Sequence, residues 1–481
     1  MSKEAPVILG TRRFDIRDQE VFARLSGDGN PIHMDALAAR RSIVGDVVVH
    51  GIHTVLWALE QLAQSPACPD GIGSLEVQFP HPVYLGEEIS LRLRRHDGAD
   101  LRLAVVAGDK VAASIRLGGA ALPQASDEVR DSVLAPPAAP RDIAFDDLAG
   151  QHGTVPHVVS ADDFVSIFPT AAARFGAPVL RDLAACSQLV GVYCPGLRSV
   201  FSRLALRWHH RGLTPPLEYR VTDTDSRFSM VTMTVGNGAF DGTIQAFSPP
   251  PPPSQPSLAD LARHVAPDAF AGQTALVVGG SRGLGELTAK AIAAGGGRTW
   301  VTYAVGRDDA ERVVEEIRRF GGESQCFAYD VTQPAATQLA GLGPNRPSHV
   351  YYFATGYISR ARTMAFDAAL LERFMAFYVQ GYHALLQALW DGGARDVTGF
   401  YPSSVFVTER PRGMTEYAMA KAAGEILVAD LETLFPGYRS HGVRLPRLLT
   451  DQTAEILRQG LPPAIDVLLP ELLAIRGGAA R

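Results

Sequence analysis

Apolar and polar positions form two similar stretches in the first half of the chain. Each stretch begins with an apolar segment of helical length, at residues 50–63 and 180–192, and continues with runs in which apolar and polar residues alternate. Strict alternation is typical of strands with one buried face. The expected strands are residues 89–95, 101–107, 111–117, 217–221, 229–235 and 242–247. A helix followed by antiparallel strands, present twice, predicts an internal repeat in which each half wraps a sheet around a central helix.

The pattern changes after a proline-rich segment. Residues 249–253 are five consecutive prolines, which favour an extended spacer and cannot continue a helix or a sheet. Beyond them we expect strands at 274–278, 299–303 and 325–329 and helices at 286–294 and 308–320. Strands that alternate with helices predict a parallel sheet with crossover helices, a doubly wound α/β domain of the Rossmann type.

These changes divide the chain into four parts. Residues 1–125 and 140–249 form the two halves of the repeat, 249–257 form the linker, and 258–481 form the α/β domain. A softer boundary lies near residues 135–140, where prolines and alanines gather. The length of 481 residues agrees with several domains, because single cores rarely grow past about 250–300 residues.

Composition narrows the classes of function. The net charge of −6 argues against an intrinsic surface for nucleic acid or anionic membranes, and no apolar run approaches the ~20 residues of a membrane span. The first ten residues lack the apolar core of a signal peptide, so we expect a soluble, cytoplasmic protein. Four scattered cysteines form no CxxC pair, which favours reduced structural thiols: Cys68, Cys186, Cys194 and Cys326.

A candidate acid–base motif precedes the first apolar helix. Asp28 and His33 are five residues apart, and Asn30 and Pro31 favour a turn between them. Removal of water beside a thioester needs two acid–base groups on one substrate and a donor for the developing enolate oxygen. A turn can direct both side chains into one pocket, where Asn30 can orient the aspartate. Backbone N–H groups near Gly51, where the next helix begins, can bind the thioester oxygen.

The segment from Phe22 to His33 resembles the MaoC-like, R-specific enoyl-CoA hydratases. The family pattern is an aromatic residue and then Ser-Gly-Asp-x-Asn-Pro-aliphatic-His, and this chain meets it throughout. The residues at 50–51 and 79–86 also fall where the family has similar residues, so the resemblance covers about residues 10–120. It implies a hotdog fold, here a double hotdog made by the repeat, and an acyl thioester substrate on CoA or an acyl carrier protein.

The second repeat lacks a counterpart of this motif. Asp162 and Asp163 lie in a plausible location, but no Asn-Pro-x-His follows them. The resemblance therefore implies a non-catalytic half that completes the unit and widens the acyl pocket. Three other histidines lack suitable partners in the sequence and are expected to be structural or exposed: His53, His81 and His157.

A glycine-rich turn follows the first strand of the α/β domain. The glycines stand between the expected strand at 274–278 and the next helix, and a helix N-terminus after such a turn can bind the pyrophosphate of a dinucleotide. The candidate cofactor-binding residues of this turn are Gly279, Ser281, Arg282, Gly283, Leu284 and Gly285.

Ser404, Tyr417 and Lys421 form a second candidate catalytic set. The tyrosine and the lysine lie one helical turn apart, so the cation can favour the ionised phenol, and the serine precedes the tyrosine by thirteen residues. With the glycine turn, these residues resemble the short-chain dehydrogenase/reductases over about residues 270–455. The resemblance implies that Tyr417 protonates a carbonyl oxygen, Lys421 binds the nicotinamide ribose and Ser404 holds the carbonyl.

The surroundings of this set depart from the family pattern. Val278 replaces a common threonine, residues 353–356 replace Asn-Asn-Ala-Gly, and Tyr378 stands where a helix asparagine often completes the proton relay. The segment at 444–450 stands where a longer loop covers nicotinamide in the family. These departures leave the three catalytic residues in place and concern the proton relay and loop closure.

The expected cofactor is NADPH rather than NADH. No acid ends the second strand, at residues 301–306, where an acid would bind the ribose diol of NAD. Arg282 and Arg307 can bind the extra phosphate of NADP instead. The resemblance places the adenine against Asp330 and Val331.

The two candidate sites predict consecutive chemistry. Reduction of a 3-ketoacyl thioester gives the R-3-hydroxyacyl thioester that the other site dehydrates to a trans-2-enoyl thioester. We therefore expect a bifunctional enzyme of fatty-acyl or polyketide-like biosynthesis, without a metal, that forms homo-oligomers through its reductase domain. Two alternatives are open: catabolic hydration followed by NAD-linked oxidation, and a hydratase joined to a non-catalytic dinucleotide-binding domain.

Overall fold

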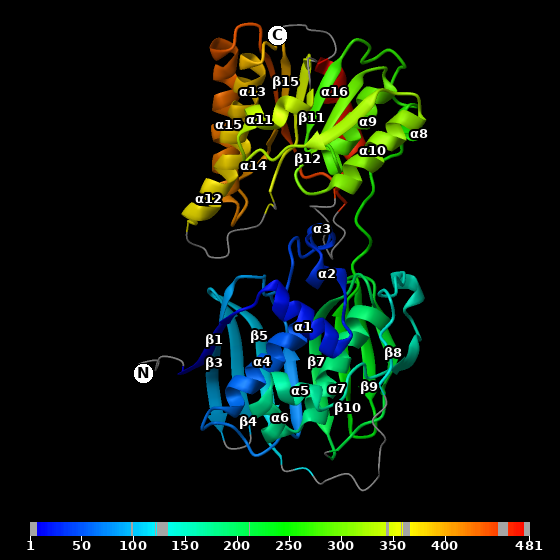
Figure 1. Cartoon of the computed structure of the whole chain (residues 1–481), viewed down its shortest axis with the longest axis vertical. Coiled ribbons are helices and arrows are strands. Elements are labelled where there is room, and N and C mark those ends of the chain that lie inside the picture. The colour runs from blue at the N-terminus through cyan, green and yellow to red at the C-terminus, as the bar shows by residue number, and fades with distance from the viewer. Residues whose placement is uncertain are drawn as a thin grey trace. The chain divides into compact units, whose positions relative to one another are not determined.

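In the computed structural model the chain forms two compact units that divide between Pro251 and Pro252, inside the run of prolines. Each unit contains its own sheet (Figure 1). The structure describes residues 7–97, 100–120, 122, 133–210, 212–342, 346–356, 358, 366–450 and 460–475. The expected end of the first repeat, at residue 125, lies outside the described residues.

The N-terminal unit is built on one antiparallel sheet of ten strands in the order β1-β3-β4-β5-β2-β7-β10-β9-β8-β6. Two five-stranded halves with the same connectivity meet where β2 pairs with β7. The six strands expected in this region are confirmed within a few residues. The strands are β1 (Val7–Arg13), β2 (Ser74–Gln78), β3 (Glu88–Asp97), β4 (Asp100–Ala107), β5 (Lys110–Gly118), β6 (His152–Val155), β7 (Val200–Trp208), β8 (Leu217–Asp225), β9 (Met230–Gly236) and β10 (Phe240–Phe247).

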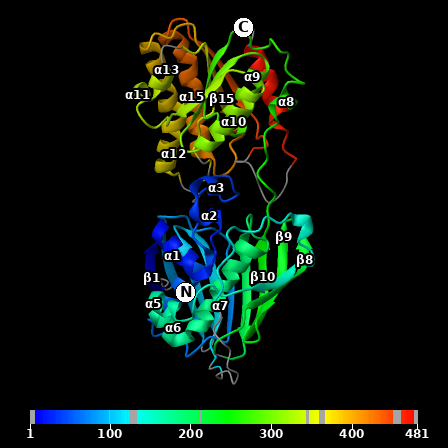
Figure 2. The same ribbon diagram turned by 45° about the vertical axis from the view of Figure 1, so that its right-hand side comes forward.

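Two long helices, α4 (Gly51–Ala63) and α7 (Ala177–Gln188), pack against each other and against one face of this sheet (Figures 1 and 2). Nearly all of both helices is buried in the apolar core of the unit. The helix expected at residues 180–192 continues beyond α7 as a π turn, η2 (Leu189–Tyr193). The shorter helices are α1 (Ile16–Ser26), α2 (Pro31–Met34), α3 (Ala36–Arg40), η1 (Phe145–Asp147), α5 (Asp163–Ile167) and α6 (Pro169–Phe175).

The C-terminal unit is built on a parallel sheet of six strands in the order β13-β12-β11-β14-β15-β16. The order reverses between β11 and β14, and ligands of doubly wound sheets bind at such a switch point, beyond the carboxyl ends of the strands. The strands expected here are confirmed, as is their parallel pairing. They are β11 (Thr274–Val278), β12 (Arg298–Tyr303), β13 (Ser324–Ala328), β14 (His349–Tyr352), β15 (Thr398–Ser404) and β16 (Arg439–Leu445).

Helices cover both faces of the parallel sheet (Figure 1). One face carries α8 (Leu258–Leu261), α9 (Gly283–Ala294), α10 (Arg307–Arg319) and α16 (Ala464–Ala474). The other carries α11 (Ala335–Gln338), η3 (Leu339–Leu342), α12 (Ala368–Met375), the π turn η4 (Ala376–Gln380), α13 (Gly381–Asp391), α14 (Phe406–Glu409) and α15 (Thr415–Leu434). Among the helices described, none has the length and apolar character needed to cross a bilayer.

Candidate active sites

The acid–base motif forms a tight turn between α1 and α2. α1 ends at Gly27, whose positive φ of 74° turns the chain. Asn30 caps α2, because its Oδ1 accepts a hydrogen bond from the Ile32 N–H at 3.1 Å. The N–H of Asn30 donates to Asp28 Oδ1 at 3.2 Å. Asn30 therefore orients the aspartate through its backbone, while its side chain shapes the turn.

The second repeat completes this turn. Ser187, near the end of α7, donates to Asp28 Oδ2 at 2.7 Å. A Cβ on Gly191 would lie 2.1 Å from Asp28 Oδ1, so the π turn approaches the carboxylate more closely than a side chain permits. The side-chain amide of Asn30 donates at 2.8, 3.3 and 3.2 Å to the carbonyl oxygens of Gly191, Gly196 and Leu197. Both repeats thus position Asp28.

Sequence reasoning misses Ser187 and Gly191. Ser187 is 159 residues from Asp28 along the chain, and the second repeat has no motif that attracts attention. One signal is present: a serine and a glutamine interrupt the apolar stretch at residues 183–192. Polar residues inside a buried helix need partners, and here the serine finds one in the motif of the first repeat.

His33 lies beside Asp28 with a defined tautomer. Its Nδ1 is 2.7 Å from the carbonyl oxygen of Val48, which can only accept, so Nδ1 carries the proton and Nε2 keeps its lone pair. The ring of His50 stacks on that of His33 with 3.8 Å between centroids. The Nε2 of His50 donates to the backbone oxygen of Asp28 at 2.9 Å. His50 thereby supports both members of the pair.

Burial sets the protonation of the two groups. Removal from water raises the pKa of Asp28 above its usual 3.8, although His33, Ser187 and Asn30 act in the opposite direction. Removal from water, with His50 as a second cause, lowers the pKa of His33 from 6.5 to about 3. Both shifts favour the neutral forms. Groups shifted in these directions suit an acid and a base, the two roles that removal of water requires.

The start of α4 adjoins this pair. α4 begins at Gly51, directly after His50, without a side-chain cap, so its first N–H groups have no acceptor within the helix. A Cβ on Gly51 would lie 3.0 Å from the Phe79 ring, so glycine lets this ring pack over the helix start. The partial positive charge of a helix N-terminus stabilises an anionic oxygen. Gly51 therefore stands where an enolate oxygen can be bound.

Asp28, His33 and His50 also offer metal-ligating atoms that lie within 4.8 Å of one another. An imidazole coordinates a metal through the nitrogen lone pair in its ring plane. The two rings are stacked, 3.8 Å apart and 27° from parallel, so their lone pairs lie side by side and do not converge on one point. This geometry suits an acid–base pair better than a metal centre.

The glycine turn of the C-terminal unit has the shape of a dinucleotide cradle. Gly279 and Gly283 adopt positive φ values of 76° and 60°. A Cβ on Gly285 would lie 2.3 Å from the carbonyl oxygen of Gly279, so the turn closes only around glycine. α9 begins at Gly283 without a side-chain cap, which leaves its first N–H groups for an anion. The other predicted residues of this turn are half-buried in it: Ser281, Arg282 and Leu284.

The residues expected at the adenine and at the NADP phosphate have local partners. Asp330, after β13, accepts from the backbone N–H and the hydroxyl of Thr332 at 2.9 and 2.7 Å, and Val331 is buried. Arg307 pairs with Glu311 at 2.8 Å, and both side chains are exposed. An exposed pair of this kind is weak, so Arg307 can exchange Glu311 for a phosphate.

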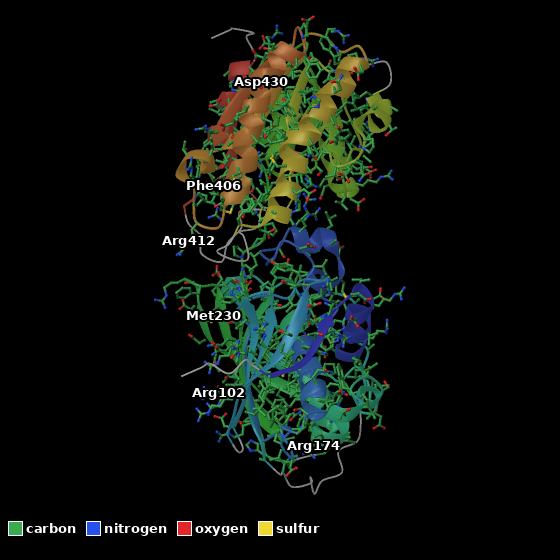
Figure 3. All side chains as sticks on the ribbon, turned by 90° about the vertical axis from the view of Figure 1, so that its left-hand side faces the viewer. Arg102, Arg174, Met230, Phe406, Arg412 and Asp430 are labelled. Carbon is green, nitrogen blue, oxygen red and sulfur yellow. The ribbon has the colours of Figure 1, made fainter. Side chains whose placement is uncertain are left out.

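Ser404 and Tyr417 lie together at the carboxyl end of β15. Ser404 accepts a hydrogen bond from the backbone N–H of Phe406 at 3.2 Å. Burial raises the pKa of Tyr417 to about 12, and the neighbouring Ser404 hydroxyl offsets part of this shift. Phe406, which Figure 3 labels, lies at the start of α14. Its ring meets that of Tyr417 edge-on with 6.1 Å between centroids.

Lys421 follows Tyr417 on α15, and its Nζ donates to the carbonyl oxygen of Pro402 at 2.7 Å. The ring of Tyr378 lies 4.0 Å from the same Nζ. Burial lowers the pKa of Lys421 to about 7. The structure thus gathers the three predicted catalytic residues, with the lysine held between a strand carbonyl and an aromatic ring.

Two family models match parts of the chain. The model of the MaoC like domain matches residues 6–114, and the model of the short chain dehydrogenase matches residues 273–341. The first range contains the Asp28 and His33 turn, and the second contains the glycine turn and Asp330.

Individual relatives match the C-terminal unit. Versicolorin reductase 1 of Aspergillus parasiticus is 41% identical over 66 residues, which are 14% of this chain and 25% of that protein. An uncharacterised oxidoreductase of Methylorubrum extorquens is 41% identical over 71 residues, 15% of this chain and 28% of that protein. The chain thus spans about a quarter of the length of these relatives. A solved short chain dehydrogenase of Escherichia coli in complex with NADPH has 20% identity and a TM-score of 0.39, over 44% of this chain and 93% of that one. The chain joins a MaoC-like domain to a short-chain dehydrogenase domain.

Proposed function

We propose that the chain is a bifunctional enzyme of fatty-acyl or polyketide-like biosynthesis. Its C-terminal unit reduces a 3-ketoacyl thioester with NADPH, and its N-terminal unit dehydrates the resulting R-3-hydroxyacyl thioester to a trans-2-enoyl thioester. The observation that carries the proposal is the presence on one chain of a buried Asp28–His33 pair and a buried Ser404–Tyr417 pair. The product of the second pair is the substrate of the first.

We further propose that the N-terminal unit is a double hotdog with one catalytic site. In support, its two halves share one connectivity, and each contributes a central helix. α6 begins with a proline, as α2 does. When these two prolines are aligned, the second repeat has Ser166, Phe168 and Ala171 at the positions of Asp28, Asn30 and His33. Neither an acid nor a base is left there.

We call residues 166–171 the silent turn, and two observations support this location. Asp162 and Asp163, which the sequence suggests as its location, lie instead at the start of α5. The carboxylate of Glu60 on α4 accepts from the N–H groups of Thr170 and Ala171 at 3.2 and 2.8 Å. Glu60 thus pairs with the first N–H groups of α6, much as Ser187 on α7 bonds to the turn of the first repeat. Its carboxylate therefore has a structural role in the second repeat.

The proposed dehydration begins from the neutral forms that burial favours. The Nε2 of His33 removes the proton next to the thioester carbonyl, and Asp28 gives its proton to the departing hydroxyl group, which leaves as water. The N–H groups at the start of α4 hold the enolate oxygen. The resulting carboxylate and imidazolium stabilise each other, since each shifts the pKa of the other toward the charged form.

In the proposed reduction, NADPH when bound supplies the hydride. Ser404 receives the N–H of Phe406, so its own proton is available to the substrate carbonyl. Tyr417 gives its proton to the carbonyl oxygen as that oxygen gains charge. Gly279 and Gly285 let the backbone of the turn close tightly, and the uncapped start of α9 offers its first N–H groups to a pyrophosphate. We propose that Arg307 exchanges Glu311 for the NADP phosphate.

Incubation of the full chain with acetoacetyl-CoA and NADPH tests both steps together. The proposal predicts NADPH oxidation and the appearance of crotonyl-CoA by mass spectrometry, with R-3-hydroxybutyryl-CoA as the intermediate. The same experiment with acetoacetyl carrier protein identifies the preferred carrier. Absence of both NADPH oxidation and crotonyl-CoA hydration with either carrier would contradict the proposal.

A second candidate function is a dehydratase joined to a dinucleotide-binding domain without turnover. Two contacts of Lys421, with the Pro402 carbonyl and with the ring of Tyr378, favour this second candidate. They already engage the lysine that, in the resembled family, binds the ribose of the cofactor. Fluorescence titration separates the two candidates. This second candidate predicts NADPH binding without ketone reduction, whereas the bifunctional enzyme shows both.

A further inference from the structure

Lys421 is enclosed by aromatic rings. Its side chain is buried on α15, and Nζ donates one hydrogen bond, to Pro402 O at 2.7 Å. Three ring centroids lie 4.0, 5.2 and 6.0 Å from Nζ, those of Tyr378, Tyr401 and Tyr417. A lysine ammonium is normally hydrated at all three of its N–H donors, and here aromatic rings replace much of that water.

The backbone around Tyr378 is closed to water by a second phenol. Tyr378 lies in the π turn η4, and such turns leave carbonyl oxygens without their usual helical donors. The hydroxyl of Tyr401 donates to the carbonyl oxygen of Tyr378 at 3.0 Å. A Cβ on Gly424 would lie 2.0 Å from that hydroxyl, so a glycine in α15 makes room for it. The carbonyl at this turn is therefore paired with a tyrosine.

The ring of Tyr378 is fixed in place. Its hydroxyl lies 2.5 Å from Thr355 Oγ1, which itself donates to the carbonyl oxygen of Gly356 at 2.9 Å, so the phenol donates to the threonine. Phe374 stacks on the ring with 5.9 Å between centroids, and Tyr417 meets it at 86°. With 1% of its surface exposed, Tyr378 cannot leave this position without opening the core.

We propose that Tyr378 is a positioning residue of the reductase site, whose ring replaces a polar, hydrated relay around Lys421 and holds the ammonium on the Pro402 carbonyl. This inference rests on the proposed reductase function. A cation–π contact offsets only part of the hydration that a buried ammonium loses. Lys421 is therefore protonated, and able to stabilise the ionised phenol of Tyr417, only below a pH that Tyr378 helps to set.

The charges around Lys421 are otherwise fixed. The titratable groups that face it are Tyr417 and Glu425 on α15, Tyr401 on β15 and Tyr378 on η4. Glu425 attracts the ammonium, but it is held by two bonds of 2.7 Å from Arg444. Burial outweighs this attraction and lowers the pKa of Lys421 to about 7. Tyr378 is the nearest of these groups and is uncharged. Its substitution by another uncharged residue therefore alters the hydration of the Lys421 ammonium and leaves the surrounding charges unchanged.

Carbon-13 NMR of lysine-labelled full-length chain tests the inference directly. The chain has only four lysines, Lys3, Lys110, Lys290 and Lys421, so Lys421→Arg assigns the signal. We expect the Lys421 signal to titrate near neutral pH in the wild type and in Tyr378→Phe, which keeps the ring. Tyr378→Asn admits water and should raise the midpoint by about one pH unit or more. Tyr382→Phe, whose hydroxyl meets Tyr438 instead, is the control and should leave it unchanged.

The outcomes separate this inference from the proposed function. A midpoint near 10 in the wild type, or one that Tyr378→Asn fails to raise, overturns the inference. If the asparagine variant does not fold, Tyr378→Leu keeps an apolar side chain without an aromatic face and must lower the midpoint. In ketone reduction, the alkaline limb of kcat should move with the midpoint while KM changes little. A chain that reduces no ketone, yet shows these titrations, overturns the reductase function alone.

Discussion

Asp28 receives hydrogen bonds from both repeats, from the Asn30 N–H and from the Ser187 hydroxyl. The serine stabilises the ionised carboxylate, so Ser187→Ala raises the pKa of Asp28 further. Because Asp28 is the acid in the proposed dehydration, the alkaline limb of kcat/KM should move to higher pH. Loss of the bond should also lower kcat by roughly tenfold. The pH profile of R-3-hydroxybutyryl-CoA dehydration measures both effects.

Ser166→Ala is the matched control for this prediction. Ser166 occupies the corresponding position in the silent turn, and its hydroxyl donates only to the Asp163 carbonyl on an exposed helix. Its removal should alter neither kcat nor the pH profile. An alkaline limb that stays in place in Ser187→Ala would show that Ser187 does not act on the carboxylate.

Asp182 on α7 is a second buried carboxyl group, outside the proposed chemistry. It accepts from Thr214 at 2.7 Å and from Asn237 at 3.0 Å, and burial raises its pKa from 3.8 to about 7. The folded chain keeps a proton that the unfolded chain releases, so stability from this group is complete below about pH 4 and falls until about pH 7. Asp182→Asn should be more stable than the wild type by about 2–4 kcal/mol at pH 8 and similar to it at low pH. Urea unfolding at pH 5 and pH 8 measures this, and parallel pH dependences would refute it.

Single residues can be predicted where their chemistry depends on local spacing. Asp28 and His33 share one turn, and Tyr417 and Lys421 share one helix face, so short motifs reveal them. Ser187 reaches its partner only through the packing of α7 on α1 and α4. A contact between residues 159 positions apart leaves no periodic trace in the sequence.

Among the elements, the π turn η2 places its backbone directly against the carboxylate of Asp28. Gly191→Ala puts a methyl group 2.1 Å from the present position of Asp28 Oδ1, so the carboxylate or the turn must move. A displacement of this size in a catalytic group costs about a hundredfold in rate. We therefore predict a loss of about this size in crotonyl-CoA hydration, with NADPH-linked reduction unaffected.

Gly29→Ala provides the comparison for Gly191→Ala. Gly29 is the direct neighbour of Asp28, but its added methyl group meets no atom within 4 Å. Hydration by this variant should stay close to that of the wild type. Equal losses in both variants would mean that the turn tolerates no change at all, and no loss in Gly191→Ala would mean that the close approach is without consequence.

Elements are predictable where one face is buried throughout. The helix at 50–63 and the strands that the sequence predicts in both units are present in the structure within a few residues. The sequence does not predict β1, because its residues are exposed or half-buried and do not alternate between apolar and polar. The sequence does not predict the π turns either, because one extra residue in a turn barely disturbs a helical pattern. The helix expected at residues 180–192 therefore includes η2.

In the whole molecule, each of the two candidate sites lies in a unit that has its own apolar core. The apolar core of the N-terminal unit runs from Phe14 to Ala246, and those of the C-terminal unit begin at Leu258, beyond the prolines. The order of the domains follows from the change in pattern along the chain. The strand order within each sheet does not, because it depends on pairing between distant segments.

The separate cores lead us to expect separable activities, and one set of assays on the full chain tests this most directly. Crotonyl-CoA hydration and acetoacetyl-CoA-dependent NADPH oxidation are measured for the wild type, His33→Ala and Tyr417→Phe. We predict that His33→Ala loses hydration by about a hundredfold or more and keeps reduction, and that Tyr417→Phe does the reverse. Both activities unchanged in the two variants, or both lost together in a folded chain, would contradict two catalytic sites on one protein.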